Sequence, residues 1–212
     1  MAGGLVITHK VMYLFWSMTD GTFTLVDARG RKYLTAPERE RFLAAVRSHP
    51  KPGVQTLART LAMTGCRVSE ALGIRACDVD LEANEVRIST LKRRTDHWRA
   101  VPVPEDLVHA LELVHRVRRL QGSARGASRL LWPITRQTAN RQVGAIMRTA
   151  GIEGPQACPR GLRHSYGVAA VTAGVPLPTV AAVLGHASLT TTAIYTTAIG
   201  AEARELVSRV WG

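Results

Sequence analysis

Four short segments of this sequence hold arginine, lysine, histidine or tyrosine where these side chains could bind or attack a phosphate group. One is TGCRVSEAL, residues 64–72. There Gly65 is typical of a helix end, and Arg67 stands at the start of the next helix, where free backbone N–H groups favour an anion. Glu70, three residues later, is placed to orient the Arg67 guanidinium. The alternative is an ordinary Arg–Glu pair on the surface.

A second segment, CPRGLRHSYGVAA, crowds polar side chains at the start of a predicted helix. Arg160, Arg163 and His164 all lie within its first turns. Positive side chains at a helix N-terminus oppose the helix dipole, so the cluster predicts a bound anion, most simply a phosphate. The alternative is a helix end that tolerates exposed arginines.

A third segment, LGHASLTTTAIYT, places His186 nine positions before Tyr195 in a stretch without charged side chains. Gly185 ends one short helix, and Ser188 can cap the next, which carries Tyr195. Tyr195 would then be held at a fixed position relative to His186, where its phenol could act as a nucleophile. The alternative is that Tyr195 is an ordinary core or surface residue.

The fourth segment is basic and joins two predicted strands. NEVRIST and RAVPVP alternate apolar and other residues, which is typical of paired antiparallel strands, so KRRTDHW forms their connection. Lys92, where the first strand ends, could point its ammonium at a molecule that lies against the sheet. We expect contacts with the phosphates of a nucleic acid from Arg93, Arg94 and Arg99. The alternative for all of them is a solvated charged turn.

The remaining pattern predicts a mainly helical chain with one small antiparallel sheet, an α+β fold. An arm over 1–34, with at most a small hairpin around residues 28–30, precedes a helix that begins after Thr35, a favourable N-cap. We predict a flexible loop over 123–128. The other predicted helices cover residues 54–63, 68–76, 105–120, 136–149, 160–173, 178–184, 189–197 and 201–210.

Charge favours a polyanionic partner. Lys and Arg number 28 against 16 Asp and Glu, a formal net charge of +12, although a generally basic proteome would give the same excess. The 3 cysteines have no metal-ligand spacing, and their odd number argues against a disulfide framework. The N-terminus lacks the pattern of a signal peptide, and the apolar run 168–185 is interrupted by Gly174 and two prolines. We therefore expect a soluble, intracellular protein without a membrane span or a metal.

The order of these segments, with Arg67, Lys92, the pair Arg160 and Arg163, then His186 and Tyr195, resembles the tyrosine recombinase (phage integrase) family, in its Xer/integrase-like form. The resemblance covers about residues 35–200, and the nine-residue spacing from His186 to Tyr195 agrees with the family pattern. It implies the family's catalytic-domain fold over residues 35–212.

The resemblance also implies the residues' roles. Tyr195 would attack a DNA phosphodiester, form a 3′-phosphotyrosyl bond and release a 5′-hydroxyl. Arg67 and Arg163 would bind the nonbridging oxygens of the phosphate, because planar guanidinium groups can do so bidentately. His186 would add a hydrogen bond, and Lys92 would protonate the leaving 5′-oxygen. This chemistry needs no metal and no cofactor.

The sequence departs from the family at two places. Arg160 stands where the family usually has His and sometimes Lys, and arginine cannot accept a proton at accessible pH. His164, next to Arg163, could compensate. In addition, only 34 residues precede the catalytic region, whereas the resemblance implies an N-terminal DNA-clamping domain, so we expect this sequence to lack most of that domain. We expect weaker, more salt-sensitive DNA binding as a result.

The expected partners follow from the same resemblance: double-stranded DNA, and further copies of the chain in a tetrameric synapse, with a free monomer also compatible. The helix over 134–151 exposes side chains that can read base edges, although a solvated polar face would look the same; they are Arg136, Gln137, Asn140 and Arg141. The C-terminal helix would pack on a neighbouring protomer or on its own core. We expect a cytoplasmic, nucleoid-associated enzyme of a mobile element. The alternatives are supercoil relaxation like a type IB topoisomerase, and a DNA-binding regulator with weak catalysis.

Overall fold

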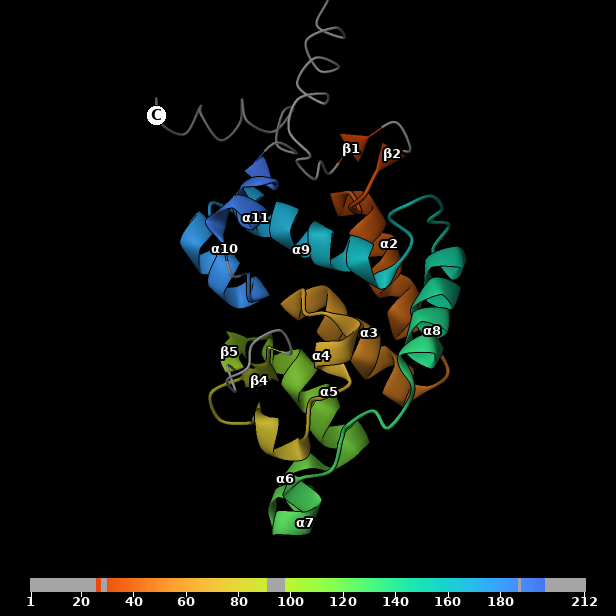
Figure 1. Cartoon of the computed structure of the whole chain (residues 1–212). Coiled ribbons are helices and arrows are strands. Elements are labelled where there is room, and N and C mark those ends of the chain that lie inside the picture. The colour runs from red at the N-terminus through yellow and green to blue at the C-terminus, as the bar shows by residue number, and fades with distance from the viewer. Residues whose placement is uncertain (1–25, 28–29, 91–97, 187, 197–212) are drawn as a thin grey trace, which may run out of the picture.

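The structure is a computed structural model that describes residues 26–27, 30–90, 98–186 and 188–196. Figure 1 shows helices around a central helix, α9 (Pro159–Thr172). Helices α10 (Leu177–Leu184) and α11 (Leu189–Ala193) lie at one end of α9, and α8 (Arg136–Thr149) lies at the other. Helix α3 (Pro52–Thr64) packs against α9, and α2 (Ala36–Arg47) packs against α3 and α8. This mainly helical arrangement with a small sheet confirms the predicted fold class.

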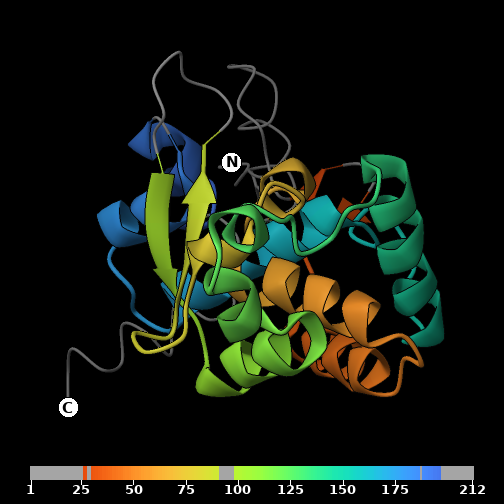
Figure 2. The same cartoon turned by 90° about the horizontal axis from the view of Figure 1, so that it is seen from below.

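The antiparallel sheet has three strands within the described residues, in the order β3 (Val79–Asp80), β4 (Glu85–Ser89) and β5 (Trp98–Pro102). The predicted pairing of these two strands is confirmed, but β4 ends at Ser89 and Trp98, predicted as part of the connection, begins β5 and pairs with Ser89. Figure 2 shows this hairpin at one side of the molecule, next to α10. The strand β3 was not predicted, because two residues are too short for an alternating pattern.

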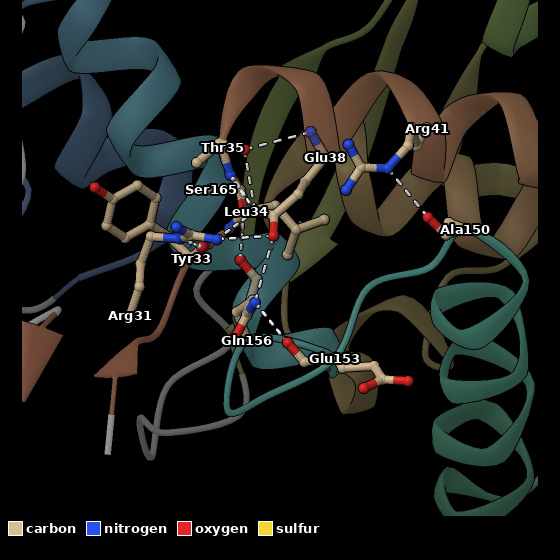
Figure 3. Close-up of polar contacts among 11 residues, drawn as sticks. Arg31, Tyr33, Leu34, Thr35, Glu38, Arg41, Ala150, Glu153, Gln156 and Ser165 are labelled. Atoms are coloured by element: carbon tan, nitrogen blue, oxygen red, sulfur yellow. Dashed lines mark hydrogen bonds and ion pairs between the residues drawn. The ribbon is translucent and has the colours of Figure 1, made fainter. Parts of the chain in front are cut away.

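The N-terminal end of the described chain is fastened to α9 by polar contacts (Figure 3). A two-stranded hairpin, β1 (Val26–Asp27) and β2 (Gly30–Arg31), leads into α2 through a capping box of Thr35 and Glu38. Arg31 donates to Glu38 at 2.6 Å, and the Leu34 N–H donates to Ser165 Oγ at 2.6 Å. The predicted N-cap and hairpin are confirmed, and the chain just before α2 is thereby fastened to α9.

Most buried side chains are aliphatic and form one large core around α3, to which Phe42, Leu57, Leu61, Ile88 and Leu107 contribute. A second, smaller cluster contains Val168, Val180, Leu184 and Tyr195. It lies where α9, α10 and the segment after α11 meet. The predicted nucleophile is thus part of the packing that holds the last described helices to the domain.

Four predicted elements are wrong in detail. The helix over 105–120 is two helices, α5 (Glu105–His115) and α6 (Val117–Gln121), because Arg116 adopts a left-handed conformation with φ 54°. That turn directs Val117 into the core, where it is fully buried. The helix predicted over 68–76 stops early as α4 (Val68–Ala71), and a 3₁₀ turn, η1 (Ala76–Asp78), follows.

The predicted flexible loop at 123–128 contains the short helix α7 (Ala124–Ala127), with Ser123 as its N-cap. The helix predicted over 189–197 ends at Ala193 within the described residues. The arm before residue 26 and the predicted C-terminal helix at 201–210 lie outside them. None of the helices in the described ranges has the length and apolar character needed to cross a membrane.

Candidate active site

One cleft of about 940 Å³ brings together the polar residues of the separate sequence segments. It is lined from α4, α8, α9 and the segment around α11. Its lining includes Arg67, Arg160, Arg163, His164, His186 and Tyr195. Two residues of α8, Arg136 and Asn140, line the same cleft. Residues more than 100 positions apart in the sequence therefore face one volume.

Arg67 is fixed at the cleft by Glu70. Its Nη1 donates to Glu70 Oε1 at 2.7 Å, and its backbone N–H donates to Oε2 at 2.9 Å, as the capping contact of α4. Burial would raise the pKa of the Glu70 carboxyl, but the Arg67 N–H and the Arg99 cation outweigh it and lower that pKa. Glu70 is therefore a buried carboxylate at neutral pH, and the predicted orientation of Arg67 by Glu70 is confirmed.

Arg99 lies behind Glu70 and not at the surface. Its Nη2 contacts Glu70 Oε2 at 3.0 Å, its Nε donates to the Val183 carbonyl at 2.6 Å, and its Nη1 donates to Thr90 Oγ1 at 3.0 Å. Only 12% of the side chain is exposed. The predicted phosphate contact of Arg99 is therefore wrong. The sequence did carry a signal for the inward direction of Arg99. Residues two apart in a strand lie on the same face, so Arg99 shares the face of Val101, which is buried.

Arg163 joins the ends of two helices to α9. Its Nη1 donates to the Gly65 carbonyl and its Nη2 to the Leu184 carbonyl, both at 2.9 Å, so the guanidinium binds the C-terminal ends of α3 and α10. Gly65 has φ 61°, which confirms it as the left-handed cap. Burial, followed by the Arg67 cation, lowers the pKa of Arg163 to about 10, which still leaves it charged at neutral pH.

His186 is oriented by the helix that follows it. Its Nδ1 lies 2.9 Å from Oγ1 of Thr192, which is fully buried, and its ring stacks on that of Tyr195 with centroids 6.2 Å apart. Burial, then Arg163 and Arg67, lowers the pKa of His186 to about 4. The imidazole is therefore neutral at pH 7. Thr192 lies in α11, whereas Tyr195 follows the end of that helix, so the predicted placement of Tyr195 on the helix is wrong.

Tyr195 is fully buried, and the rings of His164 and His186 lie near its ring, with centroids 6.1 and 6.2 Å away. Its ring lies against Gly167 of α9, and its Oη is 3.4 Å from Nδ1 of His164. Burial raises the pKa of the phenol, while Arg163 and Arg67 oppose that rise. Gly167 was not predicted as a site residue. The sequence indicates it only as a lone glycine within a helical pattern.

The other predicted residues divide into three groups. Arg160 is exposed at the cleft, as a side chain beside a bound anion would be. On α8 the predicted face is confirmed as exposed, with Val143, Ile146 and Met147 buried on the other side. Lys92, Arg93 and Arg94 lie outside the described residues. Among the described residues, no group of three or more His, Cys, Asp and Glu side chains could hold a metal ion.

Known proteins resemble this chain in sequence and in fold. The model of the phage integrase family matches residues 32–201. The XerD tyrosine recombinase of Bifidobacterium longum (strain NCC 2705) is 33% identical over 192 residues, which cover 83% of this chain and 59% of that protein. A resolvase of Escherichia coli is 29% identical over 193 residues, covering 78% of this chain and 73% of the resolvase.

The crystal structure of the XerA recombinase superposes with a TM-score of 0.69 at 27% identity and covers 84% of this chain. The match spans 64% of the XerA chain, so these Xer relatives are longer than the region shared with this protein. The catalytic domain of bacteriophage HP1 integrase, at 21% identity and a TM-score of 0.61, shares the fold. The chain therefore belongs to the phage integrase family and carries the catalytic domain of a tyrosine recombinase, a class of enzyme that breaks and rejoins DNA.

Proposed function

We propose that this protein is a site-specific recombinase that cuts and rejoins DNA strands through a covalent bond between Tyr195 and a 3′-phosphate. The observation that carries the proposal is the single cleft that gathers Arg67, Arg163, His186 and Tyr195. Two cations and a neutral imidazole there surround the phenol that the family pattern assigns as nucleophile. Family membership supports the reaction class, and the geometry supports these residues as its machinery.

In this mechanism the cleft is built for charge that develops on the phosphate. As Tyr195 Oη attacks, the pentacovalent transition state gains negative charge on its nonbridging oxygens. Arg67 and Arg163 are already fixed by Glu70 and by two helix ends, so they need not reorganise when that charge appears. Removal of one such preorganised donor typically costs about 3–4 kcal/mol of transition-state stabilisation.

The departing 5′-oxygen needs a proton, and we assign that role to Lys92 on the basis of the family pattern. The lysine belongs to the connection between β4 and β5, which starts beside Thr90, a partner of Arg99. The phosphotyrosyl bond conserves the energy of the cleaved diester, so the strand can be rejoined without a nucleotide cofactor.

The substrate would be double-stranded DNA held by the cleft and by α8. Arg136, Gln137, Asn140 and Arg141 are exposed on one face of α8, and two of them also line the cleft. Arg, Gln and Asn can each read base edges in the major groove, so we assign site recognition to this helix. A tetramer on paired sites, service to a mobile element and a place on the nucleoid in the cytoplasm complete the proposal.

A trapping experiment tests the nucleophile and finds the site together. The protein is incubated with a pool of end-labelled, nicked duplexes whose central region is randomised, so that a cut fragment diffuses away and the adduct accumulates. Covalent adducts are separated on a denaturing gel, and their DNA is sequenced. We expect adducts from the wild type and from the control Tyr33→Phe, and none from Tyr195→Phe.

The other outcomes are equally clear. Adducts formed by Tyr195→Phe would refute the nucleophile assignment. DNA binding by the wild type without any adduct would favour the DNA-binding regulator. Adducts formed at random sequences, together with relaxation of supercoiled plasmid by single protomers, would favour a topoisomerase.

A further inference from the structure

The attack by Tyr195 requires a group that takes the phenolic proton. The polar groups around the phenol come from α9, from α4 and from the segment before α11. Arg67, Arg160 and Arg163 are arginines, which cannot accept a proton. His186 stacks on the face of the Tyr195 ring, at an interplanar angle of 14°, with its Nδ1 engaged by Thr192. That position suits a phosphate contact better than a contact with Oη.

His164 contacts the reacting atom itself. Its Nδ1 is 3.4 Å from Tyr195 Oη, and its ring is tilted by 53° to the phenol ring, which brings the nitrogen to the edge where the hydroxyl lies. The side chain is 7% exposed, and it is held by α9, whose neighbouring residues Arg163 and Ser165 are themselves anchored. Nothing in this arrangement depends on a long flexible side chain.

We propose that His164 is the proton acceptor for Tyr195, so that a residue on the helix turn after Arg160 replaces the base that position 160 does not provide. This inference rests on the proposed function. In the forward step the bond from Oη to phosphorus forms, the bond from phosphorus to the 5′-oxygen breaks, and the phenolic proton moves to His164 Nδ1. The 5′-oxygen takes its proton from Lys92, as proposed above. On rejoining, the imidazolium returns the proton to Oη.

The surrounding charges keep the His164 ring neutral, although they also make it a weaker base than an ordinary histidine while the cleft is empty. Its pKa is lowered to about 4, first by burial and then by Arg163, Arg160 and Lys32, so the ring is neutral at pH 7. The same cations would oppose an imidazolium in the empty cleft. A bound phosphate brings negative charge next to the same groups, which makes the transfer more favourable when the substrate is in place.

The test measures single-turnover adduct formation on the duplex that the wild type traps best, across pH 6 to 9, an accessible range for such assays. His164→Asn keeps a polar atom close to Oη but cannot take a proton. We expect its rate at pH 7 to fall about 100-fold, because general base catalysis contributes at least that factor. We also expect the variant's rate to rise with pH across this range, while the wild-type rate stays flat.

Three further variants separate the explanations. His109→Asn changes an exposed histidine far from the cleft and should behave as wild type. Arg160→His in the His164→Asn background should restore rate by supplying a base at the other position. If His164→Asn does not fold, His164→Ala with added imidazole gives the same information, as a rate that increases with imidazole concentration.

The proposal is overturned if His164→Asn forms adducts within a few-fold of wild type, or slowly but with the flat wild-type pH profile, which would indicate a positioning role. It is also overturned if imidazole leaves His164→Ala unchanged while Tyr195 still reacts. Absence of adducts from the wild type would instead refute the proposed function itself, so the two failures are distinguishable.

Discussion

Gly167 controls where the nucleophile lies, and the substitution Gly167→Ala tests this. A Cβ at this position would lie 2.5 Å from Tyr195 Cζ and 2.6 Å from both Cε atoms, whereas ordinary contacts begin at 3.4 Å. The ring or the helix must therefore move by about 0.9 Å. Helix propensity alone would favour alanine by roughly 0.5–1 kcal/mol. Overpacking costs roughly 1–3 kcal/mol, so we expect a net loss of stability.

The catalytic effect should exceed the effect on stability. A misplacement of about 1 Å can cost about 100-fold in rate, because the reacting atoms must meet in line. Two measurements follow: thermal unfolding, with an expected decrease of about 2–4 °C per kcal/mol lost, and single-turnover adduct formation at saturating DNA. Gly53→Ala is the matched control, because a Cβ at Gly53 meets no atom within 4 Å.

A Gly167→Ala protein that melts and reacts like the wild type would refute this reasoning. Lower stability with an unchanged rate would show that the ring can shift without moving Oη. A lower rate in Gly53→Ala as well would mean that the assay reports on general effects of the substitution and not on the contact between α9 and the phenol.

Two further predictions concern the buried charges and the imidazoles. Arg99→Met removes one partner of Glu70, whose side chain is 1% exposed. Because Arg67 still pairs with Glu70, we expect the free energy of unfolding in urea to fall by about 2–4 kcal/mol. A decrease below about 1 kcal/mol would contradict the role given to Arg99. His164 and His186 each have a folded pKa of about 4 against 6.5 for the ordinary side chain. The unfolded chain therefore binds protons first as the pH falls, and stability should decrease between pH 6.5 and 4 by roughly 2–5 kcal/mol in total. Melting curves across that range measure it, and a constant melting temperature would contradict the low values.

The sequence predicted best what depends on neighbouring residues in the chain. Thr35 and Gly65 carry local capping chemistry, and both elements begin or end where that chemistry predicts. The break at Arg116 was missed because arginine gives no signal for a left-handed residue; the burial of Val117 stabilises it, and burial depends on distant residues.

The same limit applies within the candidate site. The resemblance to the family implied that Arg67, Arg163, His186 and Tyr195 form one site, and the cleft contains all of them. The sequence alone could not establish that Arg99 points inward, because its partners there, Glu70 and the Val183 carbonyl, come from distant parts of the chain. The contact between His164 and Tyr195 likewise joins residues 31 positions apart, which no local pattern predicts.

The stretch of α9 from Arg163 to Gly167 contacts several neighbouring segments at once. Arg163 contacts the ends of α3 and α10, His164 the phenol, Ser165 the backbone of Leu34, and Gly167 the phenol ring. Successive residues of a helix are rotated by about 100°, so one inserted or deleted residue would turn every one of these side chains away from its partner. Single substitutions damage one contact each, whereas a change of length damages all of them. A change of length within this stretch of α9 should therefore abolish folding or activity where each single substitution weakens one contact.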